Sequence, residues 1–168
     1  MRRSTEQGFT LVEIMIVVAI IALLAAIAIP NVLRGRTTAN ESACIGNMRA
    51  LVSSLEMYRS VNNTYPDNTA GEWQLRMYTN PTPDFGPPSF NVAMTASTVQ
   101  GYNYTYTGVV NGPTYDVLAV PTTLNTTGTR SFQTDESGLI SHCTGTAILA
   151  NFTDGNEATI DAAPTACD

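Results

Sequence analysis

An acidic residue inside a long apolar segment is the feature of this sequence that most invites chemistry. Glu13 is the fifth residue of the run FTLVEIMIVVAIIALLAAIAI, which covers residues 9–29. An ionised carboxylate in hydrocarbon costs at least about 2.5 kcal/mol, so such an acid needs a partner. If the chain were cut between Gly8 and Phe9, the new α-amino group of Phe9 would carry the opposite charge. Because the two groups are too constrained to meet well at one helix start, we expect them to pair between neighbouring, axially staggered helices and to set their register.

Two other sets of polar side chains, both near the C-terminus, could bind a metal ion or act as a nucleophile. His142 stands beside Cys143, but no second pair of ligands follows at a metal-binding spacing. We therefore expect His142 to be an exposed residue at a strand end. The loop Asp154–Asp161 offers the oxygen ligands that calcium prefers, but Ala158 stands where an EF-hand needs its third acid. A solvated acidic loop is the main expectation there, calcium is the alternative, and no other cofactor or metal is predicted.

The charge composition argues against nucleic acid as the main partner. The chain of 168 residues has 8 Arg, no Lys and 14 acids, which gives a net charge of -6. Removal of residues 1–8 would take away two Arg and one Glu, and would leave 6 Arg against 13 acids, a net charge of -7. Nucleic-acid binding draws on clustered basic residues. No Gly-rich phosphate loop, Ser/His/Asp set or paired-carboxylate cleft is visible either, so we predict that the protein is not an enzyme.

The apolar run is long enough to span a membrane as a helix. Its 21 residues measure about 31 Å at the α-helical rise, which matches the ~30 Å hydrocarbon core of a bilayer. Arg2 and Arg3 precede it and should stay on the cytoplasmic side, so the chain beyond Pro30 is expected to be exported. A secretory signal peptide is one alternative, although its cleavage site would follow a shorter apolar core. A plain membrane anchor is another, but it leaves Glu13 unexplained.

The N-terminal segment strongly resembles the signature of type IV prepilins and type II secretion pseudopilins, in the stretch GFTLVEIMIVVAIIALLAAIAIP from Gly8 to Pro30. The resemblance implies that residues 1–8 are a leader, that a prepilin peptidase cuts after Gly8, and that Phe9 becomes an N-methylated first residue. It gives Glu13 the place of the family's glutamate in assembly register. It also makes Pro30 the proline that kinks the helix.

The same resemblance implies a set of partners and a location. The precursor would be a single-pass protein of the inner membrane, and the processed chain would join an extracellular surface filament, a helical homopolymer of itself. A prepilin peptidase, a pilus assembly ATPase and an inner-membrane platform are the implied partners. The main prediction is a structural subunit of a type IV pilus-like filament, most like a type IVa-like major pilin. A type II secretion major pseudopilin and a minor pilin are the alternatives, and a membrane-anchored enzyme or binding module would need an active-site constellation that we do not find.

Beyond Pro30, the spacing of apolar residues predicts that the helix continues to about Val61 with one face packed on a domain. The apolar face carries Met48, Leu51, Val52, Leu55 and Tyr58. The opposite face carries Arg49, Ser53, Ser54, Glu56 and Arg59. A cluster of turn-forming residues at positions 62–68 predicts the end of the helix.

The remaining sequence predicts an antiparallel sheet of about four strands, which together with the helix makes an α+β protein. The resemblance implies the same pilin fold, with a long kinked N-terminal helix packed on the sheet. The expected strands cover Tyr102–Thr107, Tyr115–Pro121, Arg130–Thr134 and Gly138–His142, with a further strand at Ala147–Phe152 and a short helix near Glu72–Tyr78. The expected organisation is a leader at 1–8, a filament-core helix at 9–30 and a globular domain at 31–168.

Three cysteines complete the list of candidate functional residues. In an exported domain, a disulfide between Cys143 and Cys167 is the expected pairing, which would close a C-terminal loop. Many pilins carry such a loop. Cys44 is expected to be a small buried apolar residue, and a bond between Cys44 and Cys143 is the alternative.

Major pseudopilins bind calcium in a C-terminal loop, which keeps calcium as an alternative for the loop Asp154–Asp161.

Overall fold

A computed structural model describes residues 8–67, 75–79, 85–86, 98–108, 112–144, 158–159 and 165–166 of the chain. The chain divides into two compact units, Met1–Gly35 and Arg36–Asp168. Helix α1 runs from Leu11 to Asn62 and contributes residues to both units.

In the first unit, α1 carries an apolar surface that no described residue covers. The helix begins at Leu11 and continues through Pro30 without a break, as the sequence predicts. Its large apolar side chains from Leu11 to Leu33 are each between 50% and 74% exposed. Since these side chains point in every direction around the helix, the segment has no polar face of its own to turn toward water.

In the second unit, the rest of α1 forms one wall of a core. The buried residues of this stretch are Glu41, Cys44, Met48, Leu51, Ser54, Leu55 and Tyr58. They include four of the five residues predicted on the apolar face, and the fifth, Val52, is half-buried. The prediction that Ser54 lies on the polar face is wrong. Its hydroxyl donates a hydrogen bond to the Ala50 carbonyl at 2.8 Å, so it can be buried without water.

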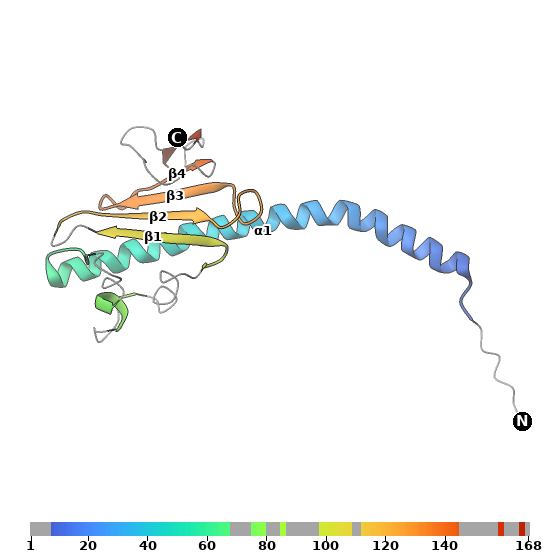
Figure 1. Cartoon of the computed structure of the whole chain (residues 1–168), viewed down its shortest axis with the longest axis horizontal. Coiled ribbons are helices and arrows are strands. Elements are labelled where there is room, and N and C mark those ends of the chain that lie inside the picture. The colour runs from blue at the N-terminus through green and yellow to red at the C-terminus, as the bar shows by residue number, and fades with distance from the viewer. Residues whose placement is uncertain are drawn as a thin grey trace, which may run out of the picture. The chain divides into compact units, whose positions relative to one another are not determined.

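Four strands form an antiparallel meander in which each strand pairs with the next along the chain. They are β1 (Tyr102–Gly108), β2 (Tyr115–Pro121), β3 (Arg130–Asp135) and β4 (Ile140–Thr144). Figure 1 shows them side by side along the C-terminal part of α1. The predicted α+β fold, with a long N-terminal helix and a four-stranded antiparallel sheet, is therefore confirmed.

Three shorter elements complete the described chain. The π-helical segment η2 (Leu75–Thr79) takes the place of the short helix predicted near Glu72–Tyr78. Two strands of two residues each, β5 (Ala158–Thr159) and β6 (Thr165–Ala166), pair with β4 on its free side. The predicted strand Ala147–Phe152 lies outside the described residues.

Tyrosines hold the sheet against the helix. In β1, Tyr102, Tyr104 and Tyr106 are buried while the residues between them are exposed, which confirms the predicted alternation. The hydroxyl of Tyr106 donates to the carbonyl of Pro66 at 2.6 Å, and this bond ties the segment after α1 to the sheet. That close approach depends on Gly108, because a Cβ there would overlap the same carbonyl.

Candidate functional site

The chain just before α1 is open and exposed. Gly8, Phe9 and Thr10 are not helical, and Phe9 is 86% exposed. The peptide bond between Gly8 and Phe9 therefore lies outside the hydrogen-bonded helix, which starts three residues later at Leu11. A protease that binds an extended substrate can reach this bond without unwinding the helix.

Thr10 and Glu13 form a reciprocal cap at the start of α1. The Thr10 backbone N–H donates to Glu13 Oε2 at 2.8 Å, and the Glu13 backbone N–H donates to Thr10 Oγ1 at 3.2 Å. This is the capping box of a Thr-x-x-Glu sequence, which satisfies two backbone donors that a helix start leaves without partners. The Thr10 hydroxyl donates a further bond to the same Oε2 at 2.7 Å.

The cap fixes the position of the Glu13 carboxylate and decides which of its two oxygens can still accept a hydrogen bond. All three bonds involve Thr10, and those that Glu13 accepts go to Oε2. No described residue donates a hydrogen bond to Oε1. The carboxylate is thus held at the helix start by bonds within its own first turn, and its Oε1 is open to a cation such as an α-ammonium group.

The helix that follows is an apolar surface of the kind that lipid or other helices cover. It is long and apolar enough to cross a membrane by length and composition.

Pro30 cannot donate a hydrogen bond to the preceding turn, which is the physical reason to expect a kink there. Next to it, the Asn31 side chain donates to the Ile27 carbonyl at 3.1 Å and so keeps its amide satisfied within the apolar surface. The kink itself stays a prediction.

A buried carboxylate on α1, which the sequence analysis did not single out, joins the helix to the loop between β2 and β3. Glu41 is 7% exposed. Its Oε1 accepts from the Thr129 backbone N–H at 2.8 Å and from the Thr129 hydroxyl at 2.6 Å. Its Oε2 accepts from Arg130 Nε at 2.9 Å and lies 2.8 Å from Arg130 Nη2. From the residue just before it, the Asn40 side chain donates to the Thr127 carbonyl at 2.9 Å.

The bonds to Glu41 decide its charge state. Burial acts to raise the pKa of this carboxyl group, but the hydrogen bonds from Thr129 and the guanidinium of Arg130 outweigh it and hold the pKa below its usual value. A signal for Glu41 is present in the sequence, because it precedes Cys44 and Met48 on the same apolar stripe at helical spacing. An acid on such a stripe must find a partner when the stripe is buried.

The expectation that His142 is exposed at a strand end is wrong. The residue lies inside β4 and is 0% exposed. Its ring is 6.3 Å from that of Phe132, the residue opposite it on β3. Neither ring nitrogen has a hydrogen-bond partner among the described residues. The expectation failed because β4 extends to Thr144, beyond the predicted strand end at His142, and because His142 shares a sheet face with the buried Phe132.

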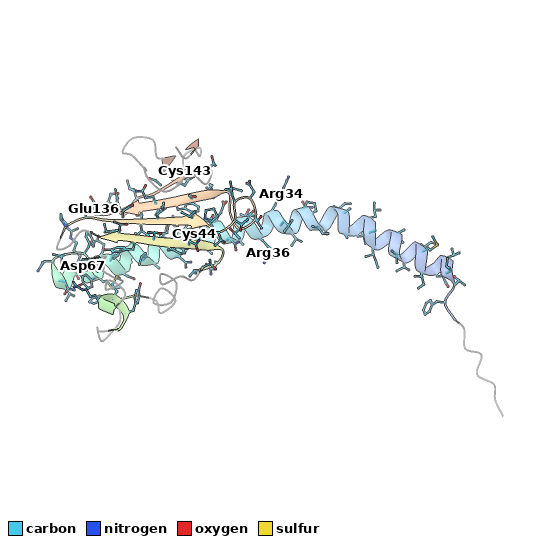
Figure 2. The ribbon with its side chains drawn as sticks, in the orientation of Figure 1. Arg34, Arg36, Cys44, Asp67, Glu136 and Cys143 are labelled. Carbon is cyan, nitrogen blue, oxygen red and sulfur yellow. The ribbon has the colours of Figure 1, made fainter. Side chains whose placement is uncertain are left out.

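The structure tests the prediction for Cys44 but not the predicted disulfide between Cys143 and Cys167. Cys44 is a free thiol with 0% exposure, and burial raises its pKa to about 12. This confirms its interpretation as a small buried residue and makes the alternative bond between Cys44 and Cys143 wrong. Figure 2 places Cys44 on α1 and Cys143 on β4. Cys167 lies outside the described residues, so the disulfide between Cys143 and Cys167 stays a prediction.

The possible calcium loop is also beyond what the structure shows. The side chains of Asp154–Asp161 lie outside the described residues. Within the described part of the chain, no group of three or more His, Cys, Asp or Glu side chains could hold a metal ion.

Comparisons with known proteins match the N-terminal segment and extend beyond it. Residues 3–29 match the family described as the prokaryotic N-terminal methylation motif. The type II secretion system core protein G of Klebsiella michiganensis is 38% identical over 71 residues, which cover 42% of this chain and 50% of that protein. The type IV wide pilus major component PilA4 of Thermus thermophilus is 43% identical over 75 residues, which cover 45% and 57%. The core protein G of Vibrio cholerae is 38% identical over 84 residues, which cover 49% and 56%.

These similarities cover only part of this chain and part of each relative. The chain spans about half the length of the curated relatives it matches. No solved structure matches the chain.

Proposed function

Because this chain is a member of the type IV pilin and pseudopilin family by its N-terminal methylation motif, we propose that it is the structural subunit of a surface filament. The observation that carries the proposal is the arrangement of the N-terminal unit. An exposed, non-helical peptide bond between Gly8 and Phe9, a capped carboxylate and an apolar helix that no described residue covers follow one another within residues 8–33. The proposed filament is of the type IV pilus kind, with this chain as its major subunit.

The proposed assembly begins in the inner membrane. The uncut precursor is held there as a single-pass protein, with Arg2 and Arg3 of the leader on the cytoplasmic side. A prepilin peptidase removes residues 1–8, and the new amino group of Phe9 is methylated. Cleavage removes two positive charges that would be costly in the core of a helix bundle.

The processed helices then leave the lipid and pack against one another. Their apolar side chains exchange one apolar environment for another, so packing alone gives little preference for any axial register. The Glu13 carboxylate supplies that preference in our proposal. Its Oε1 accepts from the Phe9 ammonium of a neighbouring subunit, and a slipped register would leave both charges bare in a medium of low dielectric constant. An assembly ATPase and a membrane platform would drive the process, and no catalytic activity is proposed for the chain itself.

A second candidate function has a specific observation in its favour. Core protein G of type II secretion recurs among the relatives, in Klebsiella, Vibrio and other organisms. A pseudopilus subunit would use the same N-terminal unit in a filament that stays within the cell envelope. A minor pilin, present at few copies per filament, is the remaining alternative within the family.

Mass spectrometry of filaments sheared from the cell surface separates these proposals. We expect abundant chain whose N-terminal peptide begins at methylated Phe9. If the processed form is found in the cell envelope and not in the sheared fraction, the pseudopilin function replaces the pilin function. Detection of uncut chain alone, with Arg2 and Arg3 still attached, would contradict the filament function in either form.

A further inference from the structure

Three ionisable side chains lie near one another where α1 faces the strands β3 and β4: Glu41 and Arg130 form an ion pair, and both influence the charge of His142. Glu41 comes from α1, Arg130 from the first position of β3 and His142 from β4. Phe132 lies directly opposite His142 in the sheet register, and Arg130 is two residues before Phe132. Residues two apart on a strand share a face, so Arg130 and His142 are diagonal neighbours on the face that packs on α1.

The three side chains have different hydrogen-bonding states. Glu41 accepts four contacts from Thr129 and Arg130, which fix the end of the β2–β3 loop (residues 122–129) on the helix. His142 is fully buried, and neither of its ring nitrogens has a hydrogen-bond partner in the described part of the chain. A proton added to His142 in this arrangement would therefore place a second positive charge beside Arg130 with no acceptor to receive it.

We propose that Glu41, Arg130 and His142 form an acid-sensitive latch, which holds the β2–β3 loop on α1 at neutral pH and releases it as the pH falls. At neutral pH the imidazole is uncharged, and the guanidinium of Arg130 is paired with Glu41. On acidification, opening of the latch exposes His142 to water, where it takes up a proton that the closed form cannot accommodate. Since our proposed function places the domain outside the membrane, the latch would respond to the pH of that compartment. All residues of the latch belong to the second unit, so its opening does not depend on whether a filament forms.

The direction of the pH effect follows from the shifts of the two groups. Burial, and after it the charge of Arg130, lower the pKa of His142 below its ordinary value of 6.5, while Glu41 acts in the opposite direction. The open form binds the proton more readily, so the closed latch is fully stable above pH 6.5 and loses stability as the pH falls below it. Glu41 also has a lowered pKa, so its contribution is present above 4.5 and is lost at still lower pH.

Few other ionisable groups face this cluster among the described residues. From α1 there is the Cys44 thiol, whose pKa is raised to about 12 by burial. From β1 there is Tyr102, whose hydroxyl donates to the Arg130 carbonyl at 2.9 Å and whose pKa is also raised by burial. Both stay uncharged across the acidic range. The backbone of β5 pairs with β4 at His142, and its side chains are not described.

Hydrogen exchange in the untagged full chain, held in detergent micelles, tests the latch. The backbone N–H of Thr129 donates to Glu41, so its protection factor reports whether the latch is closed. Between about pH 6.5 and pH 5, we expect this protection to fall by up to about tenfold per pH unit, the slope for uptake of one proton. The amides of β1 provide the reference and should keep their protection after correction for intrinsic exchange. If Thr129 tracks β1 throughout this range, the latch does not exist.

Because the chain contains a single histidine, its imidazole resonance can be followed without mutation. We expect it to titrate below its ordinary value and with the same midpoint as the loss of Thr129 protection. An imidazole that titrates while Thr129 remains protected would overturn the proposal.

Two variants separate the latch from general loosening of the loop. His142→Phe removes the titrating group and should leave Thr129 protection independent of pH between about 6.5 and 5. Asn40→Ala removes the hydrogen bond to Thr127, which does not titrate, and should lower protection by the same factor at each pH. If the pH dependence persists in His142→Phe, His142 is not the sensor.

Discussion

Two glutamates on the same helix show how the surroundings of a carboxylate determine its role. Glu13 lies at the exposed helix start, where it bonds to Thr10 in its own first turn. Glu41 is buried and bonds to residues that follow it by 88 and 89 positions. The first carboxylate has one oxygen that accepts no hydrogen bond from a described residue, and we propose that a neighbouring subunit supplies the donor. The second uses both oxygens within the domain and therefore acts on its stability.

The role of Glu13 can be divided between its cap and its charge. Glu13→Gln can keep the capping bonds with Thr10 but has no charge for the Phe9 amine, whereas Glu13→Ala loses both. We expect both variants to be cut after Gly8, as judged by gel mobility, and both to give a reduced yield of methylated filament in the sheared fraction. Wild-type yield from Glu13→Gln would show that capping is its whole role. Wild-type yield from Glu13→Ala would remove Glu13 from assembly altogether.

Removal of the Glu41 carboxylate should destabilise the second unit. Glu41→Ala leaves the guanidinium of Arg130 and the two donors of Thr129 without their acceptor, and we expect a loss of about 2 kcal/mol in the free energy of unfolding. Urea unfolding of the full chain in detergent, followed by circular dichroism, measures it. The control is Glu136→Ala in the exposed β3–β4 turn, which should change stability by less than about 0.5 kcal/mol. Equal effects from the two variants would show that the Glu41 bonds contribute nothing.

At the scale of elements, two glycines should respond to the same substitution in opposite directions. A Cβ added at Gly46 meets no atom within 4 Å, so Gly46→Ala should stabilise α1 by about 1 kcal/mol. A Cβ at Gly128 would overlap the hydroxyl of Tyr102, which is buried and bonded to the Arg130 carbonyl. Gly128→Ala should therefore cost about 2 kcal/mol. The same urea experiment compares them, and a stabilising Gly128→Ala would contradict the packing around Tyr102.

Periodicity predicted the elements well because burial on one face repeats at a fixed interval. The stripe from Met48 to Tyr58 and the tyrosines of β1 are cases in which apolar residues mark the buried face directly. The same reasoning failed for Ser54 and His142, because a polar residue was assumed to need solvent. Ser54 satisfies its hydroxyl on its own helix, and His142 lies inside β4 on the same sheet face as Phe132, neither of which a local pattern reveals.

The candidate functional residues also differ in whether the sequence signal is local or depends on residues far apart in the chain. Gly8, Phe9 and Glu13 could be put forward as candidates because the relevant pattern lies within a few consecutive residues, and their roles stay predictions. Glu41 could not be matched to Thr129 and Arg130, because that pairing joins positions 88 and 89 residues apart. Only the packing of the sheet on α1 brings these groups together (Figure 1).

At the scale of the whole molecule, the state of the three cysteines gives a simple test. Cys44 is a free thiol, and the predicted disulfide joins Cys143 to Cys167. Alkylation of the unfolded, unreduced full chain should therefore add one label, and alkylation after reduction should add three. Mass spectrometry of the intact protein counts the labels. Three labels before reduction would show that the disulfide is absent, and labelling of Cys44 in the folded chain would contradict its burial.

The distribution of burial along α1 has a practical consequence for the preparation of the protein. Every described side chain that is buried lies at or beyond Glu41, whereas the exposed apolar residues of the N-terminal unit end at Leu33. A gene whose coding region starts at Arg36 would keep all of these buried side chains and omit the surface that requires detergent. Its product should appear in the aqueous fraction of a cell lysate, which would make crystallisation from ordinary salt solutions a realistic goal.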